Sequence, residues 1–224
     1  MGLAENIEFV YKNIRQAARR ANRNEADIQL VAVTKQVSIE TAQQAVKLGL
    51  KNFGENKAQE LLKKRQAIPG VQWHFIGRIQ TNKIKYIVPN SEIIHSVWRI
   101  KELVEIDKRA CNLKKIQQVL IEVNVSGEDT KAGIRPEDLK SFLKEAGRFK
   151  NVKLIGFMTM APFVEDPESI RWVFRKLREL RDEYQRNYPN LVHLSMGMSN
   201  DYEIAVEEGA TILRIGTAIF KGGS

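Results

Sequence analysis

Lys35 is the residue whose type and position first point to chemistry. It ends the apolar run of residues 29–34, whose β-branched and aliphatic residues predict a strand buried on both faces. A lysine at this place has two interpretations. Its ammonium group could simply reach solvent from the strand end, or its amine could be desolvated enough to be partly neutral and form a Schiff base with an aldehyde.

Two glycine-containing runs later in the chain have the composition of an anion site. They are Ser195-Met-Gly-Met-Ser199 and Arg214-Ile-Gly-Thr217. Glycine lets the backbone approach a ligand closely, and hydroxyl and free N–H groups bind phosphates in such turns. Each run alone is also typical of an ordinary turn, so the prediction depends on where the two runs lie in the fold.

Strand and helix patterns alternate along the chain, which predicts a parallel sheet with crossover helices. Eight strands are predicted, and eight is the number that closes a (β/α)8 barrel of the TIM type. We expect one α/β barrel domain over residues 1–224, with an additional N-terminal helix over residues 3–23 that completes the outer ring. The predicted strands are residues 29–34, 52–56, 71–77, 92–97, 118–125, 152–159, 191–195 and 211–215.

The barrel prediction brings the reactive residues to one end of the molecule. Phosphate sites of such barrels often form from the loops after strands seven and eight, where the two glycine-containing runs lie. Together with a lysine after strand one, they fit a ligand with an aldehyde and a phosphate, and pyridoxal 5'-phosphate (PLP) is such a ligand. The alternative fold, an open doubly wound sheet, is disfavoured because no Gly-x-Gly-x-x-Gly follows the first strand.

Several motifs, in this order, resemble those of the pyridoxal phosphate homeostasis protein family. The resemblance covers essentially the whole chain. It implies a single-domain barrel similar to the N-terminal domain of alanine racemase, with a role in vitamin B6 and amino-acid homeostasis and no established catalytic activity. The motifs are Ala32-Val-Thr-Lys35, Phe53-Gly-Glu-Asn56, His74-Phe-Ile-Gly77 with Gln80-Thr-Asn-Lys83, Gly156-Phe-Met-Thr-Met160, Ser195-Met-Gly-Met-Ser-Asn-Asp201 and Arg214-Ile-Gly-Thr217.

The resemblance also implies the PLP-binding residues. Lys35 would form the Schiff base, and Arg214 would face the pyridine nitrogen. A guanidinium group there disfavours protonation of that nitrogen and so weakens the ring as an electron sink. The other implied contacts are Ser199, Gly216 and Thr217 to the phosphate, and Asn56, His74 and Met158 along the pocket wall.

We therefore expect a protein that stores, buffers or delivers PLP, with apo forms of PLP-dependent enzymes as candidate recipients. The alternative is a PLP-dependent enzyme such as an amino-acid racemase. Racemisation requires an acid/base group on each face of the α-carbon. Alanine racemase supplies one of them as a tyrosine from a second domain, which this chain is expected to lack, so we expect no racemase activity. We also expect a monomer.

The composition of the chain excludes several other classes of protein. The chain has 43% hydrophobic residues, one cysteine and a formal net charge of +9, which is typical of a globular protein without an intrachain disulfide. We expect a cytoplasmic protein, with Cys111 in a predicted helix as a small apolar residue of the protein core. No run approaches the roughly 20 apolar residues of a membrane span. The basic residues alternate with acidic ones and lack interleaved aromatics, so we expect no nucleic-acid partner.

A metal site is a further alternative, because His74, His95 and His193 lie on three predicted strands. Barrel hydrolases use such histidines as ligands. However, no His-x-His follows the first strand, and Arg214 at the end of the eighth strand would repel a cation. We therefore expect no metal.

Overall fold

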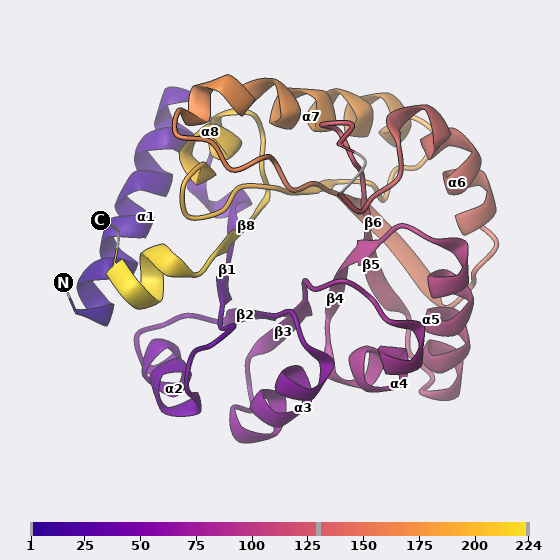
Figure 1. Ribbon diagram of the computed structural model, residues 1–224, viewed down its shortest axis with the longest axis horizontal. Coiled ribbons are helices and arrows are strands. Elements are labelled where there is room, and N and C mark those ends of the chain that lie inside the picture. Colours follow the sequence, from indigo (N-terminus) through magenta and orange to yellow (C-terminus); the bar gives the residue numbers. More distant parts are fainter. Residues whose placement is uncertain (1, 129–130, 223–224) are drawn as a thin grey trace.

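The computed structural model describes residues 2–128 and 131–222. Within these residues, eight parallel strands close into a barrel in the order of the sequence, and helices form a ring around it (Figure 1). The predicted (β/α)8 barrel is confirmed. The strands are β1 (Gln29–Val33), β2 (Asn52–Glu55), β3 (Gln72–Phe75), β4 (Ile93–Val97), β5 (Gln117–Glu122), β6 (Val152–Met158), β7 (His193–Ser195) and β8 (Ile212–Ile215).

The helices agree with the predicted periodicity, and several begin or end in short turns. The Ser38 hydroxyl accepts a hydrogen bond from the Thr41 amide over 3.1 Å and so caps the N-terminus of the second helix. The α-helices are α1 (Leu3–Arg20), α2 (Ile39–Lys47), α3 (Ala58–Ala67), α4 (Ile84–Ile87), α5 (Ile100–Asn112), α6 (Leu139–Ala146), α7 (Arg171–Gln185) and α8 (Tyr202–Glu207). The short helical turns are η1 (Glu25–Asp27), η2 (Thr81–Lys83), η3 (Val88–Asn90), η4 (Pro136–Asp138), η5 (Pro167–Ile170) and the π-helical η6 (Ala218–Gly222).

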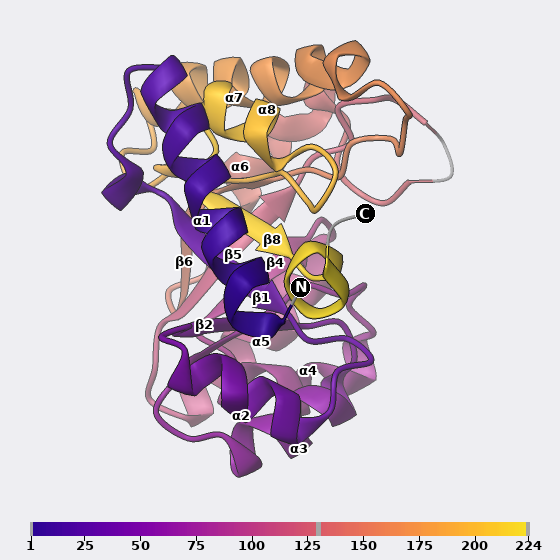
Figure 2. The same cartoon turned by 90° about the vertical axis from the view of Figure 1, so that its left-hand side faces the viewer.

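Helix α1 lies in the outer ring beside the segments that follow β7 and β8. Figure 2 shows it in front of β1 and β8, with η6 next to its first turn. The Asn6 side chain donates to the Ile219 carbonyl over 3.0 Å, and that of Asn13 donates to the Tyr202 hydroxyl over 3.0 Å. The additional N-terminal helix therefore occupies the predicted place in the ring.

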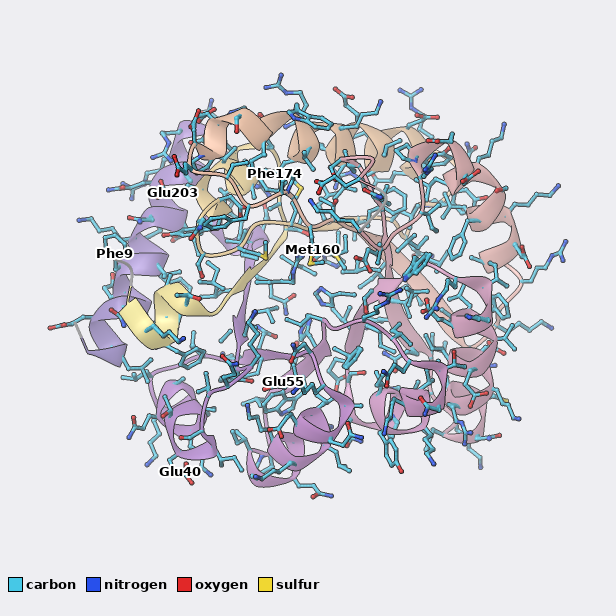
Figure 3. The ribbon with its side chains drawn as sticks, viewed as in Figure 1. Phe9, Glu40, Glu55, Met160, Phe174 and Glu203 are labelled. Carbon is cyan, nitrogen blue, oxygen red and sulfur yellow. The ribbon has the colours of Figure 1, made fainter. Side chains whose placement is uncertain are left out.

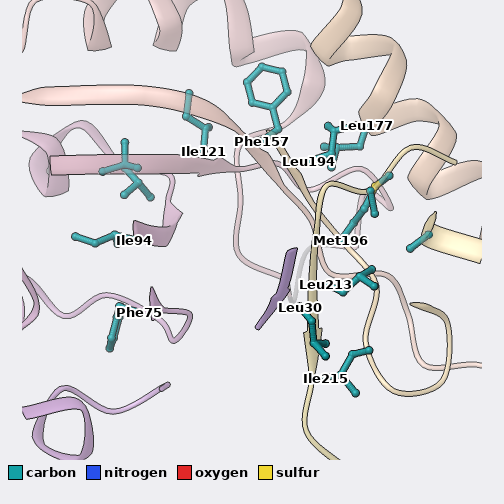
Figure 4. Packing of buried hydrophobic residues seen from close by; sticks show 14 of the residues in the cluster. Leu30, Phe75, Ile94, Ile121, Phe157, Leu177, Leu194, Met196, Leu213 and Ile215 are labelled. Atoms are coloured by element: carbon teal, nitrogen blue, oxygen red, sulfur yellow. The ribbon is translucent and has the colours of Figure 1, made fainter. Parts of the chain in front are cut away.

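The barrel has two separate apolar cores because successive side chains of a strand point to opposite faces. Outward-facing residues such as Phe157 and Leu194 pack against helices, for example against Leu177 of α7 (Figure 4). The smaller core combines residues from five strands, which can meet only inside the barrel. It contains Val31, Ile93, Leu120, Ile155, Met158 and Ile212.

Two local predictions are wrong. Strand β1 ends at Val33, so Lys35 lies beyond the strand and not at its last position. Cys111 is exposed, because it lies on the solvent face of α5 and not on its packed face. As for membranes, no helix in the described part of the chain has the length and apolar character of a bilayer span.

Candidate functional site

A cavity of about 510 Å³ opens at the carboxyl ends of the barrel strands. This volume is within the usual range of small-molecule sites. Loops after β1, β2, β3, β6, β7 and β8 line it, and it brings together six of the residues predicted for the site. These six are Lys35, Asn56, Ser199, Arg214, Gly216 and Thr217.

Lys35 lies in a tight turn that follows β1. The Val37 amide donates to the Thr34 carbonyl over 2.9 Å and closes the turn, and Gln36 has a φ of 62°. Lys35 is exposed, which corrects the expectation of a desolvated amine at a buried strand end. It lines the large cavity and also a neighbouring one of about 220 Å³, so its amine can reach a ligand at the barrel mouth.

The segment after β7 carries an anion-binding arrangement of backbone groups. Gly197 adopts a φ of 91°, and a Cβ at this position would lie 2.6 Å from the Ala205 side chain, so only glycine fits here. Among the contacts of the described residues, the amides of Ser199 and Asn200 have no hydrogen-bond acceptor. Free amides beside a hydroxyl are suited to binding an anion such as a phosphate.

The loops after β7 and β8 are joined at this place. The Ala218 amide donates to the Ser199 hydroxyl over 3.2 Å, which holds Ser199 beside the loop that contains Gly216 and Thr217. The Met198 amide donates to the Asp201 carboxylate over 2.6 Å and fixes the turn between them. A Cβ on Gly216 would lie 3.1 Å from the Val33 carbonyl, so glycine allows β8 to pass close to β1 at the cavity floor.

Arg214 is a buried cation in the cavity wall, with only 5% of its surface exposed. Its Nη1 donates to the Ser195 hydroxyl over 2.6 Å, and its Nη2 donates to the Thr159 carbonyl over 3.0 Å. Burial lowers the Arg214 pKa to about 10, against the opposing effect of the carboxylates of Asp201 and Glu122. The guanidinium group is therefore still charged at neutral pH, and its orientation is fixed.

A chain of buried side chains continues from Arg214 across the barrel. Nδ1 of His95 lies 2.9 Å from the Ser195 hydroxyl, and Nε2 of His95 shares a 2.9 Å hydrogen bond with Nδ1 of His74. Burial lowers the pKa of His74 to about 4 and that of His95 well below its ordinary value. Both imidazoles are therefore neutral at physiological pH.

Two predicted site residues lie deeper than expected. His74 is fully buried and is not among the described residues that line the cavity; it reaches Arg214 only through His95 and Ser195. Met158 belongs to the apolar core inside the barrel. The cavity is lined instead by residues two positions further along the same strands, Ile76 after β3 and Met160 after β6. Figure 3 shows Met160 over the centre of the barrel.

Several lining residues were not predicted. Arg78 follows β3 and adds a third cationic side chain to the cavity wall, and Asp201 adds a carboxylate. The β6–α7 loop contributes an apolar rim that includes Phe163, of which 82% is exposed. The rule that chemistry lies at the carboxyl ends of strands points to these loops, but it does not select individual side chains.

The three histidines do not converge on one point. His74 and His95 bond to each other, whereas Nδ1 of His193 lies 3.2 Å from the Thr211 hydroxyl. Within residues 2–128 and 131–222, no group of three His, Cys, Asp or Glu side chains has the arrangement of a metal site.

The geometry fits a ligand with an electrophilic carbon and an anionic group. Lys35 supplies an amine to the cavity, and Ser199, Asn200 and Thr217 supply amide and hydroxyl groups for an anion. Arg214 adds a fixed cation to the same cavity wall. A lysine amine can bond covalently to an aldehyde, and clustered N–H and hydroxyl groups bind a phosphate.

Comparisons with known proteins agree with this geometry. A family model described as alanine racemase, N-terminal domain, matches residues 6–223. The pyridoxal phosphate homeostasis protein of Aquifex aeolicus is 49% identical over 223 residues, which are 98% of each chain. The structure of PipY from Synechococcus elongatus with PLP bound is 30% identical, with a TM-score of 0.83 over 98% of this chain and 100% of that one. The crystal structure of an unknown protein from Bifidobacterium adolescentis is 32% identical, with a TM-score of 0.91 over 97% of this chain and 94% of its own.

Proposed function

Because the chain belongs to the pyridoxal phosphate homeostasis protein family, we propose that it binds PLP and takes part in PLP homeostasis. The observation that carries this proposal is the convergence of Lys35, the free amides of Ser199 and Asn200, and Arg214 on one cavity. These three features match the aldehyde, the phosphate and the pyridine nitrogen of PLP. The 30% identical PipY structure has PLP bound, which supports the same ligand here.

Lys35 is the residue that we propose to hold the cofactor covalently. When bound, PLP supplies an aldehyde that a lysine amine converts to a Schiff base with loss of one water, and a pyridine ring that withdraws electrons. Lys35 lines the cavity and makes no hydrogen bond or ion pair with another described residue. Its amine is therefore available to a ligand without the loss of an internal contact.

The phosphate would be held by the joined loops after β7 and β8. Ser199 and Asn200 offer amides, and the hydroxyl of Thr217 faces the same cavity. Hydrogen bonds to a dianion are stronger than those between neutral groups. This region would therefore supply much of the affinity, and the remaining predicted contact, Asn56, would line the wall nearest β2.

Arg214 would face the pyridine nitrogen as a charged donor. A fixed cation at that place disfavours a second positive charge on the ring, which limits stabilisation of a carbanion. Among the described lining residues, Lys35 and Asp201 are the candidates for proton transfer at neutral pH. The Met198 amide holds the Asp201 carboxylate in the loop after β7, which we assign to the phosphate, so we propose no role for Asp201 at the α-carbon of a substrate.

We therefore propose a carrier and not an amino-acid racemase. The protein would act as a cytoplasmic monomer that stores PLP and passes it to apo forms of PLP-dependent enzymes. A cavity with an exposed lysine and an open rim suits such exchange, because the bound cofactor stays accessible to solvent and to a competing amine.

The decisive experiment is an absorbance spectrum of the purified protein after addition of PLP and removal of the excess. A protein-bound band that borohydride abolishes, with a mass increase of one reduced PLP, would support the proposal. Absence of a bound chromophore at PLP concentrations that saturate known PLP proteins would contradict it.

A further inference from the structure

Directly behind Lys35 lies a buried ion pair whose two side chains do not line the cavity. Nζ of Lys64 donates to the Glu55 carboxylate over 2.6 Å. The side chains are 3% and 1% exposed. Figure 3 shows Glu55 in the interior of the ribbon, in contrast to Glu40 and Glu203, which lie at its periphery.

Lys64 occupies a position where a packing residue would be expected. The buried face of α3 contains Ala58, Leu61 and Lys64, spaced three residues apart. Burying a charged pair costs desolvation energy that apolar residues of similar size avoid. Packing of α3 alone therefore does not explain a lysine at this position.

The pair is connected to the turn that carries Lys35. Nζ of Lys64 also donates to the Thr34 carbonyl over 2.6 Å, and the Thr34 hydroxyl donates to the Glu55 carboxylate over 2.6 Å. The same Thr34 carbonyl accepts the Val37 amide, which closes the turn. Both groups of Thr34, the residue before Lys35, are thus fixed by the ion pair.

The turn requires such support. Gln36 has a φ of 62°, and positive φ at the third residue of a turn of this kind is usually reserved for glycine or asparagine. A glutamine in that conformation is strained and persists only where surrounding contacts hold the backbone in place. The second oxygen of Glu55 is buried without a partner among the described residues, which adds to the desolvation energy that the buried pair costs.

We propose that Glu55 and Lys64 are positioning residues that direct Lys35 into the cavity by fixing the carbonyl and hydroxyl of Thr34. The proposal rests on the proposed function, because it concerns covalent attachment of PLP to Lys35. The pair acts through the backbone and touches no ligand. Its effect should therefore appear in the covalent step and not in binding of the phosphate, whose contacts come from β7 and β8.

The test compares two ligands that differ at one group. Pyridoxine 5'-phosphate has an alcohol in place of the aldehyde, so it can occupy the phosphate site but cannot bond to lysine. The advantage of PLP over this analogue, as a ratio of dissociation constants, measures the covalent step. In the double variant Glu55→Gln with Lys64→Met, which leaves no unpaired buried charge, this ratio should fall about tenfold or more, since small misplacements of a reacting group have effects of this size.

The control is Lys63→Met, which removes the neighbouring lysine on the exposed side of α3 and should keep the wild-type ratio. Affinity for pyridoxine 5'-phosphate should change less than about threefold in the double variant, because a correctly folded phosphate site is retained. Equal weakening of both ligands would indicate a purely structural role and overturn the inference. An unchanged ratio would overturn it as well.

A second pair of variants keeps the inference testable if the double variant does not fold. Thr34→Val removes the hydroxyl that bonds Glu55, and Thr34→Ser retains it. The ratio should fall in the valine variant and stay near wild type in the serine variant; equal ratios would contradict the inference. A wild-type protein without any preference for PLP over the analogue would instead overturn the proposed function, and this inference with it.

Discussion

The Arg214 guanidinium donates to the Ser195 hydroxyl over 2.6 Å, and both side chains are buried. Ser195 thereby joins a cation in the cavity wall to the neutral histidine pair His95 and His74. A protonated His95 would face Arg214 across the single Ser195 hydroxyl, in a buried environment that screens charge poorly. Protonation of the histidine pair should therefore destabilise the folded protein.

The first prediction concerns the stability of the fold in acid. Burial lowers the His74 pKa to about 4, so between about pH 6.5 and 4 the unfolded chain binds a proton that the folded one does not. As the pH falls through this window, the free energy of unfolding should decrease by about 3 kcal/mol from His74 alone.

Glu122 has the opposite effect. Burial raises its pKa to about 7, so as the pH falls the carboxyl takes up a proton in the folded protein before it does so in the unfolded chain. This effect increases stability as the pH falls from about 7 to 4.5, by a similar amount.

The two effects offset each other, so removing one should reveal the other. Glu122→Gln should make the free energy of unfolding fall more steeply between about pH 7 and 4.5, by roughly 3 kcal/mol relative to wild type. Urea denaturation at several pH values measures this. Glu60→Gln, an exposed change on α3, is the control. A variant whose pH dependence matches that of wild type would refute the opposing roles of Glu122 and His74.

The second prediction is that Lys35→Ala abolishes covalent attachment of PLP and leaves the fold intact. Lys35 is exposed and makes no described contact whose loss would destabilise the barrel. Borohydride trapping followed by mass spectrometry of peptides measures the attachment, and circular dichroism monitors the fold. Lys221→Ala, which removes a lysine from the neighbouring cavity, should keep the adduct. Wild-type protein with its main adduct on Lys221 would contradict the assignment.

The third prediction is that the phosphate group supplies much of the affinity. Pyridoxal, which lacks it, should bind at least about a hundredfold more weakly than PLP, because two or more charge-assisted hydrogen bonds are lost. Ser199→Ala with Thr217→Val should weaken PLP binding about tenfold or more and affect pyridoxal much less. Isothermal titration calorimetry measures all four combinations. Equal dissociation constants of PLP and pyridoxal for the wild-type protein would refute the anion site.

The fourth prediction is that the PLP-loaded protein does not racemise amino acids at an enzymatic rate. The Tyr202 hydroxyl accepts a hydrogen bond from Asn13 on α1 and is not among the described lining residues of the cavity. Without a second positioned acid/base group, conversion of L-alanine to D-alanine should be roughly a thousandfold slower than in alanine racemase. Chiral chromatography measures the D-alanine that forms. Rapid racemisation that disappears in Lys35→Ala would favour the racemase.

The sequence alone determined the barrel and the end at which the site lies. Eight alternating strand and helix patterns leave few other topologies, and strands in one parallel barrel bring their carboxyl ends to one face. Residues that follow strands directly, such as Lys35, Asn56 and Thr217, are therefore correctly placed at the cavity from chain order alone.

Only the tertiary structure decided how deep each side chain lies and which distant groups meet. His74 and Met158 face inward as the strand alternation requires, but the cavity begins two residues later, at Ile76 and Met160. Alternation gives the direction of a side chain and not its depth, because depth depends on the stagger at which the closed barrel aligns its strands. No sequence pattern revealed that Lys64 would reach the Thr34 carbonyl, because that contact exists only once α3 packs against β1 and β2.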